Sequence, residues 1–505
     1  MIMINLKYYN YKSYYKYYLI ISNKLIHLFF LLKYFLYFVS FINILLINLI
    51  YYSFFNKSTT FLVEKLYFTI NLNGCVLIKF IQWSLDNIHF LFNDNDIGAK
   101  KIYILNLFNN LYENCKIHNI NYTKKIYNQE FNTSFDNDIE IDKNYEIKSG
   151  SVAQIYKAKF INNPSKDIAI KVVHPEIQYQ LIYPMLFIKI LRFIISNVWF
   201  LKKYNIIFNF ESFFQNIKLQ KNMNNEFNNL KYYYNIYNNN SHILIPQPLY
   251  SSDNILIMEY YNGYTIDEID ISQIEKQKII ILLNLFIKNN YMFLDYIHND
   301  LHKANWKIIN HDNIYKIIIY DFGYVIKNNM QNIYKNLSYY VDLNDYTKIS
   351  EILYHNISNI DISEIEFTNC FINYINNSNI IKAYDSNTLK LIYKFCYINK
   401  YILRDILLEI FISLLLFKKN MDTYLFFEDY DINYIVQLNF YYYEYCEKNK
   451  IFNDVKNYIH KYYINNDTIK KLYKYNNNYF DTLSGNNDQS IKYDADTEIT
   501  VNIDI

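Results

Sequence analysis

The fold is decided by the stretch His298-Asn299-Asp300-Leu301-His302-Lys303-Ala304-Asn305, which Asp321-Phe322-Gly323 follows after an apolar run. The stretch places an aspartate and an asparagine five residues apart, and the second aspartate comes 21 residues after the first (321 − 300). Phosphoryl transfer needs a carboxylate beside the attacking hydroxyl, and an amide and a second carboxylate that hold magnesium against the phosphates. These residues therefore predict Asp300 as a catalytic residue and Asn305 and Asp321 as Mg²⁺ ligands.

A lysine lies inside a predicted buried strand upstream of this loop. The strand, Asp167-Ile168-Ala169-Ile170-Lys171-Val172, is rich in β-branched residues, and a lysine there is costly to bury unless it is paired. In a kinase such a lysine contacts the α- and β-phosphates and is held by a glutamate of the next long helix. Glu226, in a helical pattern from Lys218 to Tyr237, is the predicted partner. Read separately, Lys171 on an edge strand and Glu226 on a solvated helix face are the alternatives.

Two further segments have the character of a nucleotide site. Small residues followed by β-branched ones predict a tight strand–turn–strand whose backbone covers phosphates, formed by Gly150, Ser151, Val152, Ala153 and Gln154. The loop has one glycine, so a plain hairpin is the alternative. The apolar run 255–258 ends in a polar turn, which predicts a hinge with Met258 and Glu259 beside the adenine.

These motifs, from about residue 74 to 323, resemble the UbiB-like, aarF-domain-containing atypical kinases associated with coenzyme Q (ubiquinone) biosynthesis. Gly150 to Ala158 is similar to the family's alanine-rich nucleotide loop, and Ala169 to Pro175 is similar to its lysine strand with a following His-Pro pair. Glu226-Phe227-Asn228-Asn229-Leu230 matches the family's Glu-Ala-x-Asn-Leu helix, which gives Glu226 the ion-pair role. In the catalytic loop, His-Lys-Ala-Asn stands where the family has His-Pro-Gly-Asn.

The family's N-terminal Lys-x-Gly-Gln signature is similar to Lys79-Phe80-Ile81-Gln82. Lys79 and Gln82 stand where the signature has them, but Ile81 replaces the glycine. The resemblance implies that this segment folds over the site where a protein substrate would dock and contributes Lys79 and Gln82 to the nucleotide site. The residues by themselves are typical of an amphipathic helix with Lys79 exposed, which is the alternative. A second departure is Lys148-Ser149-Gly150 in place of three alanines, which makes the loop closer to an ordinary nucleotide loop.

The N-terminus has the character of a membrane anchor. Residues 1–63 contain no Asp or Glu, and lysines at 7, 12, 16, 24 and 33 precede an apolar run from Tyr34 to Phe55. A helix over these 22 residues would be roughly 33 Å long, enough to cross a bilayer core of about 30 Å. The sequence therefore predicts a transmembrane helix at 34–55 with the lysine side cytoplasmic or matrix-like. A mitochondrial presequence and a buried helix that packs on the kinase are the alternatives.

Composition argues against nucleic-acid binding and limits what residue clusters can indicate. The 505 residues carry a net charge of +2, so the whole chain has no electrostatic footprint for nucleic acid. Five cysteines without a Cys-x-x-Cys pair indicate reduced thiols in an intracellular compartment. The 58 Tyr and 37 Phe beside 6 Gly and 5 Pro are best explained by an AT-rich genome. Tyrosine and asparagine clusters are therefore not interpreted as binding features.

The sequence thus predicts an α+β, bilobal, atypical protein-kinase-like fold with an N-terminal helical extension. Its parts are a basic N-terminus (1–63), an extension with the Lys-x-x-Gln signature (64–145), a small lobe (146–262), a large helical lobe (263–475) and a disordered acidic tail (476–505).

The resemblance implies a membrane-associated atypical kinase or ATPase that uses ATP and Mg²⁺, with membrane lipids or isoprenoid-quinone pathway components as partners. Its cellular setting would be intracellular, and the mitochondrial inner membrane if the family's context applies. Two other classes stay open. One is a nucleotide-binding pseudokinase that acts as a scaffold, and the other is a true protein serine/threonine kinase.

Overall fold

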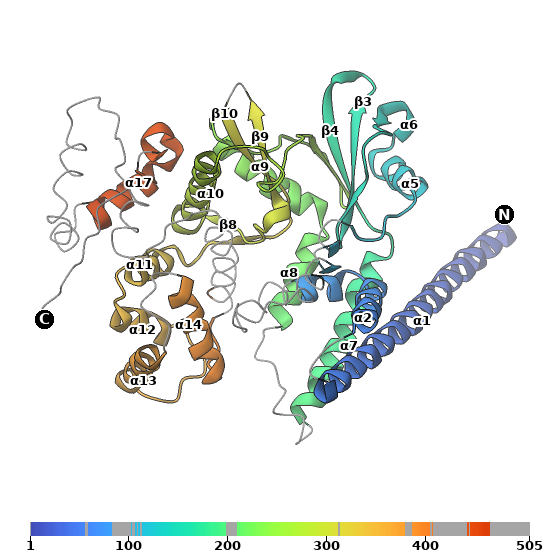
Figure 1. Ribbon diagram of the computed structural model, residues 1–505. Helices are drawn as coiled ribbons and strands as arrows, with labels where there is room; N and C mark the ends of the chain where they lie inside the picture. The colour runs from blue at the N-terminus through green and yellow to red at the C-terminus, as the bar shows by residue number, and fades with distance from the viewer. Residues whose placement is uncertain are drawn as a thin grey trace, which may run out of the picture.

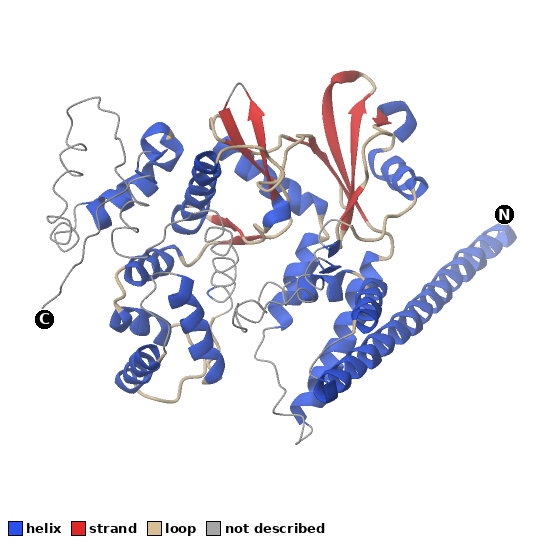
Figure 2. Ribbon diagram, viewed as in Figure 1, coloured by secondary structure: helices blue, strands red, loops and turns tan. Residues whose placement is uncertain are grey.

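The protein combines helices and sheets in two lobes, as the sequence predicts for an α+β chain (Figures 1 and 2). The computed structural model describes residues 2–55, 59–82, 103, 107–108, 110–111, 114–197, 210–311, 314–378, 386–404, 407, 442–443 and 445–464. The predicted acidic tail, residues 476–505, lies outside the described residues.

The small lobe is built on a six-stranded sheet. Its order is β1-β3-β4-β7-β6 with β2 on the side of β3, and all neighbours are antiparallel. The strands are β1 (Ile139–Ile141), β2 (Lys148–Ser149), β3 (Ala153–Phe160), β4 (Asn163–Val173), β6 (Pro248–Ser251) and β7 (Ile255–Glu259). The sheet therefore includes residues that precede the predicted lobe boundary at 146.

Alternation along β4 divides its side chains between two cores. Ile168, Ile170 and Val172 pack in an outer core with α5 (Ile120–Phe131) and α6 (Phe135–Asp138). Ala169 and Val173 pack on the other face, in the main core shared with α9 (Met223–Tyr237). Successive side chains of a strand point to opposite faces, so Lys171 shares the second face and is directed toward α9.

The helix that carries Glu226 begins later than the predicted residue 218. Asn222 caps it, because its side-chain oxygen accepts hydrogen bonds from the backbone amides of Asn224 and Asn225. The residues before this cap belong to a separate helix, α8 (Phe210–Gln220). Another helix, α7 (Ile177–Asn197), lies between β4 and α8 in the chain.

The large lobe surrounds α10 (Gln273–Phe293), whose middle is buried on all sides. Beside it lie a three-stranded sheet, β5 (Ile243–Leu244), β10 (Ile314–Ile319) and β9 (Trp306–His311), and a pair, β8 (Tyr296–His298) with β11 (Val325–Lys327). Its further helical segments are α11 (Gln331–Asp342), α12 (Tyr346–Tyr354), α13 (Glu364–Asn377), α14 (Ser386–Ile398), α17 (Asn453–Ile459), η3 (Lys303–Asn305), η4 (Lys450–Phe452) and η5 (His460–Ile464).

The N-terminal extension packs against α7 (Figure 1). The long helix α1 (Ile2–Phe55) turns back through α2 (Thr60–Asn73), and residues 75–82 form the helical segment that carries Lys79. Gly74 joins them with φ +80°, and a Cβ there would lie 2.2 Å from Gln180 Oε1 of α7. Only glycine fits this turn without strain or collision. Gln180 then accepts a hydrogen bond from the amide of Cys75 (3.1 Å), which ties the Lys79 segment to α7.

Two described helices are long and apolar enough to cross a membrane by length and composition. They are α1 over Lys24–Phe55, which contains the predicted span 34–55, and α7.

Candidate active site

Lys171 on β4 is the point at which the separate elements of the site meet. Its Nζ lies 2.8 Å from Glu226 Oε1 on α9 and 3.0 Å from Asp321 Oδ1, two residues after β10. The side chains of Lys171 and Glu226 are only 10% and 2% exposed, so this ion pair is shielded from water. The alternatives of a water-facing edge-strand lysine and a solvated glutamate do not describe this arrangement.

The charges of the cluster are coupled. Burial opposes the charge on Lys171, but Asp321 and Glu226 outweigh it and raise the pKa of the amine. Burial likewise opposes the charge on Asp321, yet Lys171 and Lys79 hold the pKa of its carboxyl well below the usual range. Burial raises the pKa of Glu226 to about 7. One reason is visible in the contacts, since Glu226 Oε2 is buried without a hydrogen-bond partner.

The Asp-Phe-Gly segment holds Asp321 in a strained and defined conformation. Asp321 has φ +54°, a left-handed conformation that non-glycine residues rarely adopt, and its Oδ1 accepts a hydrogen bond from the amide of Gly323 (3.3 Å). Phe322 is buried between the rings of Tyr233 on α9 and His298, at centroid distances of 4.9 and 5.0 Å. The packing of Phe322 therefore fixes the Asp321 carboxylate toward Lys171.

His298 holds in place the loop from His298 to Asn305, which is the predicted catalytic loop. Its Nδ1 accepts from the amide of Asp300 (3.4 Å), so Nε2 carries the proton that is donated to the carbonyl of Tyr320 (3.0 Å). Burial lowers the pKa of His298, which keeps the imidazole neutral in this role. The side-chain amide of Asn305 donates to the carbonyl of Asp300 (2.7 Å), and this bond closes the loop. The loop is thus positioned against the strand that leads to Asp321.

Lys79 reaches this site from the N-terminal extension. Its Nζ lies 3.2 Å from Asp300 Oδ2, and both side chains are mostly buried, so Lys79 does not lie on a solvated helix face. Burial opposes its charge, but Asp300 and Asp321 raise the pKa of Lys79. Burial opposes the charge on Asp300 as well, yet Lys79 lowers the pKa of Asp300. Gln82, one turn later, donates to the carbonyl of Leu111 (2.8 Å) and anchors the segment.

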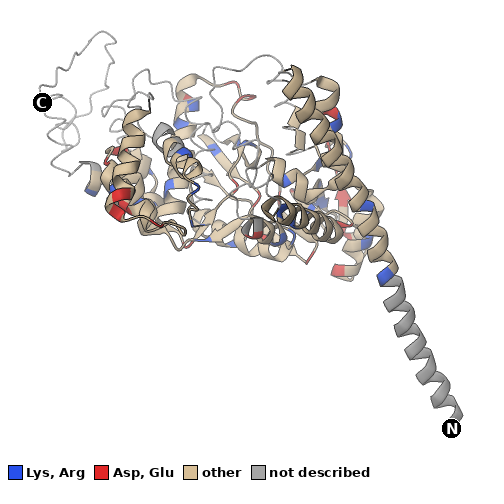
Figure 3. Cartoon of the chain, turned by 90° about the horizontal axis from the view of Figure 1, so that it is seen from below, with Lys and Arg blue, Asp and Glu red and all other residues tan. Residues whose placement is uncertain are grey.

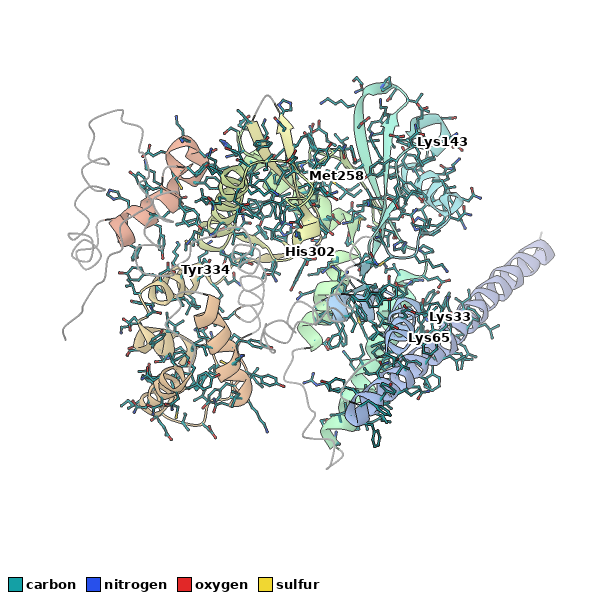
Figure 4. All side chains as sticks on the ribbon, in the orientation of Figure 1. Lys33, Lys65, Lys143, Met258, His302 and Tyr334 are labelled. Atoms are coloured by element: carbon teal, nitrogen blue, oxygen red, sulfur yellow. The ribbon has the colours of Figure 1, made fainter. Side chains whose placement is uncertain are left out.

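A pocket between the lobes connects these groups. Figure 4 labels Met258 on the hinge strand and His302 in the catalytic loop, which line it from the two lobes. The predicted site residues among its lining are Lys79, Gln82, Gly150, Ser151, Val152, Ala153, Lys171, Glu226, Met258, Glu259, Asn305 and Asp321. Asp300 is not part of that lining, but its carboxylate is paired with Lys79, which is.

Gln154 corrects one prediction. Ala153 and Ile155 line the pocket, so alternation along β3 turns Gln154 to the opposite face of the sheet. There it is fully buried and exchanges hydrogen bonds with the backbone of His118 (2.7 and 3.3 Å). Its side chain therefore supports the loop from behind and does not cover a nucleotide.

Sequence reasoning missed an aromatic group in the pocket. Tyr145, Tyr260, Tyr261 and Tyr320 line it near the hinge, and the Tyr320 hydroxyl donates to the carbonyl of Tyr261 (3.0 Å). A chain with 58 tyrosines gives no signal that separates these four from the rest. It also missed His174, whose Nε2 donates to the carbonyl of Gly150 (3.0 Å) and so steadies the loop above the pocket.

Part of the chain matches a known domain family. Residues 110–353 match the model of the ABC1 atypical kinase-like domain. A search of curated proteins finds no match. Similar solved structures include the Rv3197–erythromycin complex from Mycobacterium tuberculosis, with 14% identity, TM-score 0.42, and coverage of 59% of this chain and 80% of that one. Another is the Rio2 kinase complex with ADP/Mg²⁺ and phosphoaspartate from Chaetomium thermophilum, with 11% identity, TM-score 0.25, and coverage of 60% and 74%.

The matched segment contains the lysine strand, the Glu226 helix, the catalytic loop and the Asp-Phe-Gly segment. It therefore contains every element of the cluster around Lys171. The kinase-like fold and the family resemblance expected from the motifs are both confirmed, because residues 110–353 match the ABC1 atypical kinase-like domain of the UbiB/aarF family.

Proposed function

We propose that this chain is a membrane-associated atypical kinase or ATPase, which binds ATP with Mg²⁺ in the pocket between the lobes and transfers or hydrolyses the terminal phosphoryl group. The observation that carries the proposal is the position of Lys171, within 2.8 Å of Glu226 and 3.0 Å of Asp321. Burial of a lysine costs free energy, so a buried lysine is not expected in a core for packing alone. A lysine held by two carboxylates from other elements could bind the phosphates of ATP.

The rest of the pocket suits ATP. The adenine would lie against the hinge at Met258 and Glu259, where the backbone past β7 borders the pocket. The turn from Gly150 to Ala153 would lie over the phosphates, held from behind by His174. Lys171 would neutralise phosphate charge while Glu226 keeps the amine in place.

The donor set also fits Mg²⁺. Asp321 offers a carboxylate at the pocket, and Asn305 offers its side-chain oxygen because the nitrogen is already bonded to Asp300. Within the described part of the chain, no group of three or more His, Cys, Asp or Glu could hold a metal. That is the pattern expected for an ion that takes most of its ligands from phosphates and water. When bound, the ion would neutralise charge that develops on the phosphates.

Asp300 is the candidate base or orienting group for the acceptor. Its carboxylate would accept the proton of an attacking hydroxyl or water. In this structure the same carboxylate is paired with Lys79, whose Nζ lies 3.2 Å from Oδ2. The segment 75–82 would then obstruct the approach of a peptide acceptor to Asp300, which favours water or a small lipid-linked acceptor over a protein. An isoprenoid-quinone pathway at the mitochondrial inner membrane follows from the family resemblance alone. Attachment through α1 rests on its apolar stretch, Lys24–Phe55.

Nucleotide binding with and without Mg²⁺ tests the pocket. For the full chain, we expect ATP to bind at least about tenfold more tightly with Mg²⁺ than without it, a difference of about 1.4 kcal/mol. The Asp321→Ala variant should lose this difference. The Asp361→Ala variant, which changes an exposed carboxylate outside the pocket, should keep it. Equal binding by wild type in the two conditions would refute the assignment of a Mg–ATP site.

Turnover separates enzyme from scaffold. An Asp300→Asn variant should lower lipid-stimulated ATP hydrolysis by about 10²–10⁴-fold, the range for removal of a general base. Unchanged turnover in this variant, or turnover no higher than background in wild type, would support the nucleotide-binding scaffold, which the occupied Asp300 carboxylate favours. Strong labelling of myelin basic protein would instead support a protein kinase.

A further inference from the structure

We propose that α7 contacts lipid together with α1, so that the bilayer holds the kinase-like domain through a two-helix apolar face and not through α1 alone. This inference rests on the proposed membrane attachment and adds a second contact inside the domain itself. The face is defined by exposed apolar side chains of α1 (Leu25, Leu28, Phe29, Leu32, Phe35, Leu36, Val39, Leu46, Leu49 and Ile50) and of α7 (Ile182, Leu186, Ile190, Phe193 and Ile194).

One side of α1 is already covered by protein. Tyr34, Phe38 and Phe41 are buried, and Asn73 of α2 donates a hydrogen bond to the carbonyl of Tyr37 (3.0 Å). Lipid can therefore reach α1 only from its other side. From Lys24 to Phe55 that side carries no acidic residue, and Lys33 is paired with Glu176 at 2.7 Å. Figure 3 shows α1 along the edge of the molecule with few coloured charged positions.

The exposed residues of α7 form a stripe. Positions 182, 186, 190, 193 and 194 recur at spacings of three and four, which places them on one side of a helix. The opposite side, with Leu181, Met185 and Ile188, is buried in the main core. The side chains of the stripe therefore lie outside that core.

The two exposed sides face the same direction. Phe30 stacks on Tyr179 (4.0 Å between centroids) and Phe38 contacts Phe187 (5.5 Å), so contacts advance together along both chains and the helices run parallel. At 100° per residue, the exposed side of α1 and the stripe of α7 then fall on the same side of the seam between them. Phe35 joins them, since it is 48% exposed and its ring still lies 5.8 Å from Phe187.

Lipid suits this face better than a protein partner. Both helices contain a stretch long and apolar enough to cross a membrane, and only 22% of the stretch in α1 and 33% of that in α7 is buried. The residues that lead into the face, 1–63, include lysines and no acidic residue, which complements anionic lipid headgroups. A parallel pair of helices with one common apolar side can lie in the apolar boundary of a bilayer while the other side holds the domain.

α7 connects the proposed lipid contact to the pocket between the lobes. The helix begins two residues after His174-Pro175 at the end of β4, and Gln180 caps the segment that carries Lys79. Lipid contact along α7 would therefore fix the orientation of the pocket, and of Lys79 over Asp300, relative to the membrane surface.

Site-directed fluorescence tests the proposal on the full chain. Of the five cysteines only Cys370 is exposed, so a Cys370→Ser background allows one label at a time. The fluorophore NBD is attached in the Ile190→Cys variant (α7), the Leu46→Cys variant (α1) or the Ile365→Cys variant (α13, an exposed control). Each is mixed with phosphatidylcholine–phosphatidylglycerol vesicles that contain brominated acyl chains. We expect quenching at positions 190 and 46 and none at 365.

The other outcomes separate the α7 contact, the membrane attachment and the identity of what covers the face. Quenching at 46 without quenching at 190 overturns the role of α7 and leaves membrane attachment intact. Quenching at neither position overturns the attachment as well. A label at 190 that is shielded without vesicles, with a doubled mass in sedimentation, shows that a second copy covers the face and overturns lipid as its occupant.

A charge variant gives a second measurement. The Ile190→Glu variant should weaken vesicle binding about tenfold or more, the loss that corresponds to one buried aliphatic side chain. The Ile365→Glu variant should leave vesicle binding unchanged. Wild-type vesicle binding by Ile190→Glu, with unchanged thermal stability, overturns the proposal.

Discussion

Replacement of Lys171 by methionine tests the interpretation of the central ion pair most directly. Methionine keeps the length of the side chain and removes its charge, so the core is disturbed little. Glu226 Oε1 then loses the lysine amine 2.8 Å away, and Glu226 Oε2 is already buried without a hydrogen-bond partner. Asp321 loses the same partner but is 38% exposed and regains water.

The expected magnitude follows from this asymmetry. Breaking a buried ion pair by removal of one partner costs roughly 3–5 kcal/mol, because the other charge is left buried. Proton uptake limits that cost here, since burial already raises the pKa of Glu226 to about 7 with Lys171 present. We therefore expect Lys171→Met to lower the free energy of unfolding by about 3 kcal/mol at pH 8.

The loss should depend on pH with a definite sign. A carboxyl whose folded pKa lies above its unfolded value, 4.5, binds more protons in the folded state, so stability falls as pH rises from that value to the folded pKa. Without Lys171 the folded pKa of Glu226 rises further, above about 7. The difference between wild type and Lys171→Met should consequently be larger at pH 8 than at pH 6.

Urea unfolding followed by circular dichroism at the two pH values measures this difference. The double variant Lys171→Met/Glu226→Gln, in which no buried charge remains, should recover most of the lost stability. Lys278→Met, which removes an exposed helix pair with Glu275, is the matched control and should change stability by less than about 0.5 kcal/mol. A pH-independent loss, or a double variant no more stable than the single one, would refute the reasoning.

Three further outcomes are expected. Lys79→Met should raise the pKa of Asp300, because the positive charge that lowers it is removed, so the acidic limb of the pH–rate profile for ATP hydrolysis should move to higher pH; an unmoved limb contradicts the Lys79 contact. His118 has its pKa lowered to about 4 by burial, so its protonation should reduce stability as pH falls from 6.5 toward 4, and the His118→Gln variant should show a flatter dependence in urea titrations. A methyl group in Gly323→Ala would lie 3.1 Å from Asp321 Oδ1, so Mg²⁺-dependent nucleotide binding measured by calorimetry should weaken about tenfold, which unchanged affinity would contradict.

Much of the candidate site could be predicted because its parts are local in sequence. The spacing of Asp300, Asn305 and Asp321 defines a loop and a strand end, and Lys171 interrupts a strand that is otherwise apolar. Helical periodicity placed Glu226 on the helix that follows, although the start of that helix depended on the cap at Asn222. These features depend on backbone geometry over a few residues, which the local sequence determines.

Other features of the site depend on contacts between segments that are distant in the sequence, and the sequence did not predict them. Alternation alone cannot say which face of β3 lines the pocket, so the sequence could not show that the side chain of Gln154 lies on the opposite face. The four tyrosines near the hinge could not be separated from a composition rich in tyrosine. His174 was noted as part of a motif, but its bond to Gly150 depends on the return of the chain from β4 to the loop.

The sequence by itself determined the class of fold, the residues that meet around Lys171 and the apolar character of α1, since each is encoded in spacing or hydropathy over a short stretch. Only the tertiary structure decided that Lys79 lies on Asp300, 221 residues away, and that α7 lies parallel to α1 with its free stripe on the same side. Contacts between distant segments follow from the joint packing of complementary faces and buried charges, and that packing is a property of the whole chain.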